Sequence, residues 1–314
     1  MKIRPISKRT RFAASTGLSA SLAALLTSPA VAQDSDWKLE PDARVEFGIV
    51  SAESETADEQ ITVDGDALIA RGQVGLDFED DNSRFRLEAD RIEVFRLGEG
   101  RSDSNRDRIT AQFDQELNEA WEIQLRGRYY DDLATAESSD VDELQASVRA
   151  TYEPERAHRF RLRATWRDRE YDNIVAGGTG VQTSGNGPRL DAQYRHRIGR
   201  YHYVTLDARA EEISSADPRR GYARQSAKVA YTRPLNSDLR IRPALEFLNT
   251  RFDDRLGDLG DRRKDQLVVP EVELLWWPKK WRIEAEAKYI SSNSNLASRD
   301  REGFRLSISV GYVF

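Results

Sequence analysis

The chain ends in the stretch Phe304-Arg-Leu-Ser-Ile-Ser-Val-Gly-Tyr-Val-Phe314, and this stretch decides the fold. Its apolar residues occupy every second position, namely Phe304, Leu306, Ile308, Val310, Tyr312 and Phe314. Arg305, Ser307, Ser309 and Gly311 lie between them. Because the side chains of a β-strand point alternately to its two faces, the pattern predicts a strand with one continuous apolar face. That face begins and ends with an aromatic residue.

The stretch resembles the closing strand of bacterial outer-membrane β-barrel proteins. Their C-terminal recognition signal has a terminal Phe, an aromatic or apolar residue two positions earlier, and apolar residues at alternate positions further back. Tyr312 and Phe314 occupy the two final positions here. The resemblance implies that these two residues form an assembly signal for the barrel assembly machinery and that the protein contacts outer-membrane lipid. Only this signal matches residue by residue, so the resemblance implies no transported substrate.

The N-terminus has the pattern of a secretory signal peptide. Five basic residues precede an apolar, small-residue run from Phe12 to Leu26, which is followed by Ala30-Val31-Ala32. A short membrane anchor is the alternative, but about fifteen apolar and small residues are too few to span a bilayer comfortably. We therefore expect cleavage before Gln33, which makes residues 1–32 the signal peptide and residues 33–314 a single barrel domain.

Charge and cysteine content narrow the class of protein. Removal of the five basic residues of the signal peptide leaves 43 of the 48 basic residues against 54 acidic ones, which argues against a nucleic-acid-binding protein. The charged fraction of 32% and the mean hydropathy of −0.70 are typical of a soluble protein. A β-barrel accommodates both values, because only one face of each strand meets lipid. There is no cysteine, so no disulfide can form.

Alternation continues along the whole chain after Leu39, in about fourteen strand-like runs, and an even strand number suits a bacterial barrel. Short turns and long polar loops alternate between the runs. Outer-membrane barrels have short periplasmic turns and long extracellular loops. The sequence therefore predicts an all-β, antiparallel transmembrane β-barrel of about 14 strands (roughly 12 to 16) in the outer membrane of a Gram-negative bacterium, with both termini periplasmic.

The last strand also fits the thickness of a membrane. Ten steps of about 3.3 Å, tilted by about 40°, span roughly 25 Å along the membrane normal, which matches the lipid-facing band of such barrels. We expect this strand to close the barrel against the first one, near residues 43–50. Aromatic residues near the strand ends, Tyr203, Tyr222 and Trp277 among them, are expected to form interfacial belts. Pro243 and Pro270 lie inside predicted strands and indicate bulges or shifted strand ends there.

Catalytic chemistry has little support in the sequence. Outer-membrane hydrolases depend on His with Ser, Asp or Glu, and the only histidines are His158, His196 and His202. All three lie at or near short turns. In the alternation along their strands they share the parity of the lipid-facing residues, that is, they point to the same side, which favours a place at the water–lipid boundary. Acidic pairs such as Asp131-Asp132 are expected to be solvated, and no calcium-loop spacing is present. We expect no enzyme, no catalytic residue, no cofactor and no metal site.

The inward-facing positions carry more basic than acidic residues. We name two groups by the strands that carry them. The arginine wall comprises Arg149, Arg159, Arg161, Arg163, Arg167, Arg189, Arg195 and Arg197, and the acidic wall comprises Glu271, Glu273, Glu284 and Glu286. Facing walls of opposite charge create a transverse field, and guanidinium groups bind carboxylate, sulfate or phosphate through paired hydrogen bonds.

Two functions follow from this lumen. The first is a monomeric or weakly oligomeric porin-like channel for small anionic solutes, such as acidic sugars or aromatic acids, with the arginine wall as the selectivity surface. The second is a non-conducting barrel, filled by interlocking charged side chains, with a role in surface display or in lipoprotein or envelope biogenesis. That barrel is loosely similar to the barrel half of surface-lipoprotein assembly modifiers. Those proteins carry a periplasmic helical-repeat domain, whereas the expected mature segment before the first strand is only about ten residues long here. The loop at residues 172–187 is the best candidate for a constriction.

Overall fold

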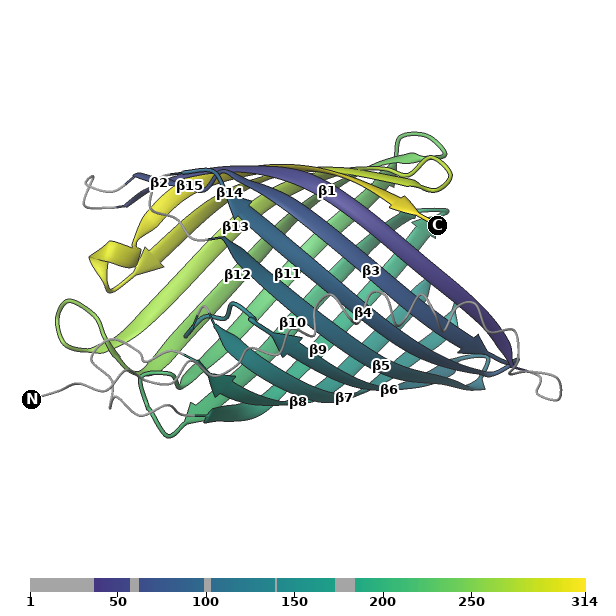
Figure 1. Cartoon of the computed structure of the whole chain (residues 1–314), viewed down its shortest axis with the longest axis horizontal. Helices are drawn as coiled ribbons and strands as arrows, with labels where there is room; N and C mark the ends of the chain where they lie inside the picture. Colours follow the sequence, from purple (N-terminus) through teal and green to yellow (C-terminus); the bar gives the residue numbers. More distant parts are fainter. Residues whose placement is uncertain (1–36, 57–61, 99–102, 139, 173–183) are drawn as a thin grey trace, which may run out of the picture.

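The computed structural model describes residues 37–56, 62–98, 103–138, 140–172 and 184–314, and within them the chain forms a closed antiparallel β-barrel (Figure 1). The fourteen long strands are β1 (Lys38–Thr56), β3 (Ala67–Glu79), β4 (Ser83–Arg96), β5 (Ser104–Asn118), β6 (Trp121–Asp131), β7 (Val141–Glu155), β8 (His158–Tyr171), β9 (Ser184–Gly199), β10 (His202–Ser215), β11 (Tyr222–Pro234), β12 (Leu239–Leu256), β13 (Arg262–Trp276), β14 (Trp281–Ser294) and β15 (Arg301–Val313). A short strand β2 (Thr62–Asp64) pairs with the end of β1, and a single turn of 3-10 helix, η1 (Ala297–Arg299), precedes β15. Among the described residues, no helix is both long and apolar enough to cross a membrane.

The C-terminal strand closes the barrel, which confirms the prediction made from its sequence. Every other long strand pairs with its neighbours in the chain, and β15 completes the ring by pairing with β1 from Arg44 opposite Val313 to Thr56 opposite Arg301. The backbone N–H of Phe314 adds one more hydrogen bond, to the carbonyl oxygen of Ala43 at 2.9 Å. The closed ring leaves no long strand with a free edge.

The alternating sequence sorts its side chains between the outside and the lumen. On β15, Phe304 and Leu306 are 64% and 54% exposed on the outer face, and Ile308 is 59% exposed. Apolar residues of the other strands are exposed in the same way, including Phe47 on β1 and Trp166 on β8. Most buried charged and amide side chains lie on the lumen side. This inverted arrangement is stable only where lipid covers the outer face.

Tight turns connect the strands at one end of the barrel, the end that carries the C-terminus in Figure 1. The side-chain oxygens of Asp80, Asn118 and Asn236 accept hydrogen bonds from backbone N–H groups two and three residues further on, which stabilises three of these turns. Lys38 lies at the same end, because it pairs with Glu79 beside the first tight turn. The longer connections gather at the opposite end.

The two prolines inside strands interrupt the ladder without a bulge. Between β11 and β12 the pairing passes from Ala230 opposite Ala244 to Arg233 opposite Ile241, and skips the two positions around Pro243. Between β13 and β14 it skips two positions around Pro270 in the same way. The register is unchanged across both gaps, so the prediction of bulges or shifted ends is wrong here. A proline removes one donor, and a closed barrel tolerates that local loss.

Three of the aromatic residues expected in the belts face the lumen. Tyr222 is 1% exposed, the guanidinium of Arg195 lies 4.6 Å from the ring centroid of Tyr203, and the indole N–H of Trp277 donates to Glu284 at 3.2 Å. A belt does form on the outer face at the tight-turn end, where stacked rings cross β6 to β9. It consists of Trp121, Tyr152, Phe160 and Tyr194. Position near a strand end was therefore a weaker guide than parity.

Candidate functional site

The lumen brings the arginine wall and the acidic wall to opposite sides. The arginine wall comes from β7, β8 and β9, and the acidic wall from β13 and β14. In the ring of fourteen, β7 and β14 are seven strands apart in either direction, so they face each other across the barrel. The two walls differ in how their charges are paired.

Four arginines of the arginine wall bind carboxylates that lie on the same strand or no more than two strands away. Arg149 contacts Asp114 at 3.5 Å and also Glu122, and Arg159 contacts Glu153. The other two pairs are Arg167 with Glu211 at 3.1 Å and Arg189 with Asp191 at 3.0 Å. Their charges are compensated by these nearby carboxylates, so these four residues contribute little to a net field.

Arg167 is part of the barrel framework. The ladder between β9 and β10 skips the positions around Pro188, and Arg167 on β8 fills this gap. Its guanidinium donates to the carbonyl oxygens of Pro188 at 3.3 Å and Glu212 at 3.0 Å. The side chain is only 1% exposed. A solute has no access to Arg167, which satisfies backbone acceptors that a proline has left without a partner.

The other four arginines of the wall have no carboxylate partner within the part of the chain that the structure describes. Arg161 donates to the amide oxygen of Gln193 at 3.5 Å, and Arg163 donates to that of Gln124 at 3.1 Å. The remaining two are Arg195, which lies over Tyr203, and Arg197, which donates to the carbonyl oxygen of Gly199 at 3.3 Å. The wall therefore keeps uncompensated positive charge in the middle of β8 and toward the tight-turn end of β9.

Two further arginines enlarge this unpaired group. Arg126 and Arg128 on β6 also face the lumen and have no carboxylate partner among the described residues. Arg126 is 8% exposed, and its Nη2 atom has no hydrogen-bond partner in the described structure. Arg128 donates to the hydroxyl of Tyr130 at 3.4 Å. Their parity indicates the lumen from sequence alone, but nothing in the sequence separates them from the paired arginines.

The acidic wall is almost neutral. Glu271 binds Lys228 and Lys288, and Glu273 binds Arg242. The other two members are Glu284, which accepts from the indole of Trp277 at 3.2 Å, and Glu286, which binds Lys288 at 2.8 Å. Basic residues on β11, β12 and β14 therefore cancel most of its charge. Any transverse field comes mainly from the unpaired arginines.

The middle of the lumen is hollow on both sides. A cavity of about 400 Å³ lies against Arg149, Arg161 and Arg163, and we call it the arginine-side cavity. A second cavity of about 320 Å³ is lined by Glu273, Glu284 and residues of β15. A larger groove of about 1030 Å³ is lined mostly by lipid-facing residues of β4 to β11, and Arg126 and Arg189 also border it.

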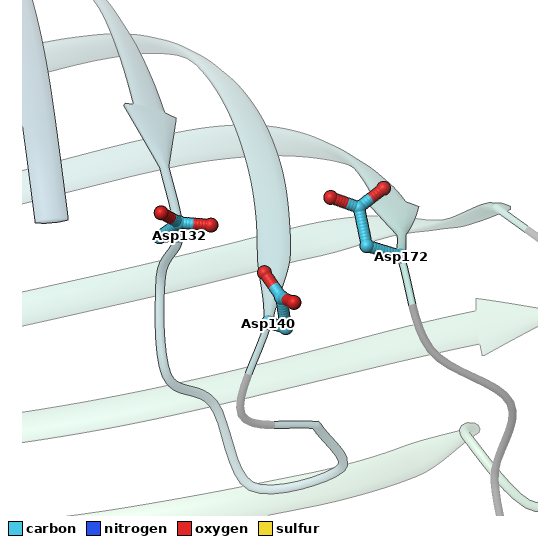
Figure 2. Close-up of side chains that lie close together, drawn as sticks. All are labelled: Asp132, Asp140 and Asp172. Carbon is cyan, nitrogen blue, oxygen red and sulfur yellow. The ribbon is translucent and has the colours of Figure 1, made fainter. Parts of the chain in front are cut away.

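The loop between β6 and β7, residues 132–140, begins and ends with acidic residues. The carboxylate oxygens of Asp132, Asp140 and Asp172 lie within 4.8 Å of one another, and Figure 2 shows them at the ends of β6, β7 and β8. Burial raises the pKa of Asp140 to about 6, and a hydrogen bond with Asp132 and the charges of Asp132, Asp172 and Asp142 act in the same direction. Mutual repulsion at this loop base is therefore relieved by protonation.

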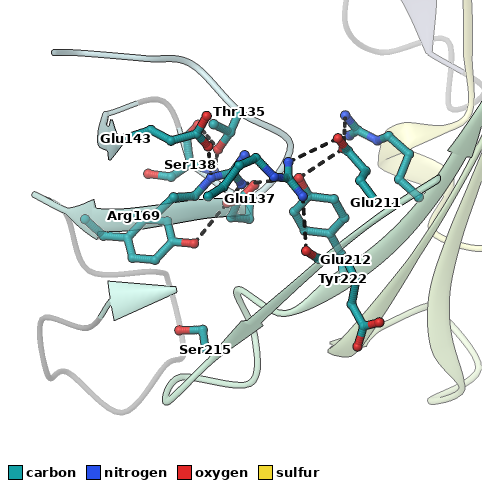
Figure 3. Close-up of polar contacts among 12 residues, drawn as sticks. Thr135, Glu137, Ser138, Glu143, Arg169, Glu211, Glu212, Ser215 and Tyr222 are labelled. Carbon is teal, nitrogen blue, oxygen red and sulfur yellow. Dashed lines mark hydrogen bonds and ion pairs between the residues drawn. The ribbon is translucent and has the colours of Figure 1, made fainter. Parts of the chain in front are cut away.

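The tip of this loop folds into the lumen, so we call its described residues, 132–138 and 140, the inward loop. Glu137 at its tip is 4% exposed and binds Arg169 of β8, which also binds Glu143 (Figure 3). The hydroxyl of Tyr171 donates to Glu137 at 2.9 Å, and the guanidinium of Arg169 donates to the hydroxyl of Tyr222 at 3.2 Å. A buried carboxylate is stable only with such multiple partners.

The inward loop also reaches the far side of the barrel. Ala136 packs on a buried cluster of Ile213, Tyr222 and Phe252, which come from β10, β11 and β12. The guanidinium of Arg255 donates to the carbonyl oxygen of Glu137 at 2.6 Å. The loop thus narrows the lumen at the end with the long loops. The loop at residues 172–187, which the sequence favoured as the constriction, lies largely outside the described residues, since these omit 173–183.

The three histidines belong to the outer face at the tight-turn end. A ring nitrogen of His158 contacts the hydroxyl of Tyr194 at 2.8 Å, and its ring lies 5.0 Å from that of His196. His202 makes the same kind of contact with Tyr231 at 2.7 Å. Histidine and tyrosine side chains of this kind suit the water–lipid boundary, where one end is apolar and the other is wet.

Solved structures of outer-membrane proteins share this fold. OmpT of Vibrio cholerae, as a mutant lacking loop L8, aligns with a TM-score of 0.53 at 9% identity over 89% of this chain and 100% of that chain. The outer membrane channel DcaP of Acinetobacter baumannii aligns with a TM-score of 0.53 at 11% identity over 88% and 97%. OmpF of Salmonella typhi, in complex with daunomycin, aligns with a TM-score of 0.50 at 9% identity over 89% and 98%.

No protein-family model matches the sequence, and no curated protein matches it either. At such low identity, the likeness to solved structures concerns the fold alone. The closed ring of fourteen strands, the lipid-facing apolar surface and these structures lead to one conclusion. The chain has the fold of the Gram-negative outer-membrane β-barrel proteins.

Proposed function

We propose that the protein is an outer-membrane channel for small anionic solutes and that the unpaired part of the arginine wall selects them. One observation carries the proposal. Arg161 and Arg163 border a cavity of about 400 Å³ and have no carboxylate partner among the described residues. A barrel built only as a rigid scaffold gains nothing from such charges, because unpaired charges in a confined lumen are costly. The proposal assigns no catalytic role to the chain.

Selection by this wall follows from the chemistry of arginine. A guanidinium group presents paired N–H donors that match a carboxylate, sulfate or phosphate group. Arg128 lies on β6, beside β7, and its partly exposed side chain extends the positive surface that an anion meets. The nearly neutral acidic wall opposite does not cancel this attraction. An anion is therefore drawn to one side of the lumen while cations are repelled there.

Planar-bilayer recordings of the purified protein in a KCl gradient test the proposal. We expect open-channel current with a reversal potential that shows chloride preferred over potassium. In the double variant Arg161→Gln, Arg163→Gln the preference for chloride falls toward unity. The control is Arg167→Gln, whose side chain faces no open space. Absence of current, or a cation preference that the double variant leaves unchanged, contradicts the channel.

We further propose that both chain ends are periplasmic and that Tyr312 and Phe314 form the signal read by the barrel assembly machinery. Support comes from the position of both described ends beside the tight turns. Deletion of Phe314 is expected to reduce assembled barrel in the outer membrane several-fold, measured by heat-modifiable migration and surface exposure. Removal of Leu259, an exposed loop residue, is the control. Normal assembly without Phe314 contradicts the signal.

A non-conducting barrel with a role in envelope assembly is the second candidate. The observation that favours it is the inward loop, whose tip is buried among charged and aromatic side chains at the end with the long loops. If this packing is complete, the bilayer recordings show no current. Crosslinking in intact envelopes then decides, since a stoichiometric protein partner supports the assembly role.

A further inference from the structure

The arginine-side cavity lies between β7 and β12 and contains charges of both signs. Half of its lining charges are already paired. Arg149 binds Asp114 and Glu122, Arg209 binds Asp191 at 2.6 Å, and Lys228 binds Glu271. These residues have little capacity left for a solute.

Four charged residues of the same cavity have no ion-pair partner in the described part of the chain. Two are cationic, Arg161 and Arg163 on β8. Two are anionic, Asp207 on β10 and Glu246 on β12. The unpaired charges therefore balance at two of each sign. A lumen that only attracted anions has no use for the two carboxylates, which repel them.

The fold keeps these opposite charges apart. The amide of Gln193 lies between Arg161 and Asp207, since its oxygen accepts from Arg161 at 3.5 Å and its nitrogen donates to Asp207 at 2.7 Å. Glu246 lies directly opposite Lys228 in the ladder between β11 and β12, but the ammonium group of Lys228 binds Glu271 of β13 instead. Each unpaired group is thus left facing a hollow space.

We propose that this cavity binds a zwitterionic solute of the amino-acid class, with a carboxylate and an ammonium group separated by several bonds. Arg161 and Arg163 take the carboxylate, and Glu246 and Asp207 take the ammonium group. Because β8 and β12 are four strands apart, the two charged ends lie on separate sides of the cavity. Its volume of about 400 Å³ lies within the roughly 300–1,000 Å³ of small-molecule sites. The inference rests on the proposed channel function and goes beyond it, because the solute carries an ammonium group in addition to the carboxylate that the arginines bind.

Two probes of equal chain length separate this inference from simple anion binding. Hexanoate carries the carboxylate alone, whereas 6-aminohexanoate carries both charges. We expect 6-aminohexanoate to block the KCl current of the reconstituted protein at a concentration about tenfold lower than hexanoate does, since it pairs with both ends of the cavity. The double variant Asp207→Asn, Glu246→Gln removes this advantage and keeps the size of both side chains.

Two further variants complete the experiment. Arg161→Gln weakens the block by both probes, because both carry the carboxylate. Glu93→Gln, on the outer face of the barrel, changes neither. Equal block by the two probes, or an advantage that survives in the double variant, overturns the zwitterion site and leaves the channel intact. If no current passes, the channel proposal fails, and calorimetric titration of the detergent-solubilised protein with the same two probes decides whether the site exists.

Discussion

Two regions of one strand, β8, differ in how their arginines are used. At mid-lumen, Arg161 and Arg163 contact only the amides of Gln193 and Gln124. Further along the same face, Arg169 binds Glu137 and Glu143 and contacts Tyr222. The sequence repeats the same residue type at the same parity. The difference arises from what the neighbouring strands and the inward loop place opposite each guanidinium.

This comparison separates two roles of a lumen arginine. Where carboxylates surround it, the side chain is buried and holds a loop in place, as Arg169 does. Where amides surround it, its charge stays available to a solute. An amide oxygen fixes the guanidinium by a hydrogen bond but does not neutralise it.

The largest effect is expected from breaking the paired region. Arg169→Ala leaves Glu137 and Glu143 buried without their cation, which costs about 3–5 kcal/mol. The inward loop should then leave the lumen, so that single-channel conductance rises and the loop becomes sensitive to protease. Arg91→Ala is the matched control, because its pairs with Glu93 and Asp107 lie on the outer face and are more than one-third exposed. Unchanged conductance and protease resistance in Arg169→Ala would mean that the loop is held by other contacts.

An intermediate effect is expected from making the unpaired region resemble the paired one. Gln124→Glu and Gln193→Glu place a carboxylate against Arg163 and Arg161 in nearly the same shape. Each new pair compensates one positive charge, so the double variant should lose most of its preference for chloride in reversal-potential measurements. Gln124→Met with Gln193→Met is the control, since it removes the amides without adding charge. An equal loss of preference in both double variants would show that shape, and not charge, sets the selectivity.

The smallest effect concerns the base of the inward loop. In the folded protein the pKa of Asp140 is about 6, above the roughly 3.9 of an ordinary aspartate in an unfolded chain. The folded state therefore binds this proton more tightly, and the resulting stabilisation is fully present below about pH 4 and is lost as the pH rises through about 6. Because the loop base is partly solvated, we expect a change below about 1 kcal/mol.

Limited proteolysis of the inward loop between pH 4.5 and 7.5 measures this effect. Cleavage should become faster as the pH rises, and Asp140→Asn should remove the dependence. Asp258→Asn, at another long connection, is the control. A pH profile that persists in Asp140→Asn assigns the dependence to another group.

Much of the fold could be predicted from the sequence because it depends on local alternation. The last strand shows this, since the positions of Phe304 to Phe314 predicted its lipid-facing side and its pairing with β1. Features that depend on contacts between strands were missed. Tyr222 is an aromatic residue near a strand end, as a belt residue would be, but its side chain points into the lumen. Phe252 and Ala136 pack against it there.

The candidate site divides in the same way. Parity identified which arginines face inward, but it did not distinguish Arg167, which fills the gap beside Pro188, from Arg163, which borders a cavity. Arg126 has the same signal and was left out of the arginine wall. Which arginine meets a carboxylate depends on the register of several strands. The register between strands that are distant in the chain cannot be predicted from any single stretch of sequence.

By itself, the sequence determined a lipid-facing barrel closed by its own C-terminal strand. The reason is that a period of two residues is a local property, which can be recognised within one strand without knowing which strands lie beside it. Only the tertiary structure decided which charges remain unpaired and which loop enters the lumen. Those outcomes depend on which side chains meet across strands that are far apart in the chain. Arg161 and Arg169 share one strand and one face. Their surroundings alone leave Arg161 available to a solute and bind Arg169 to the inward loop.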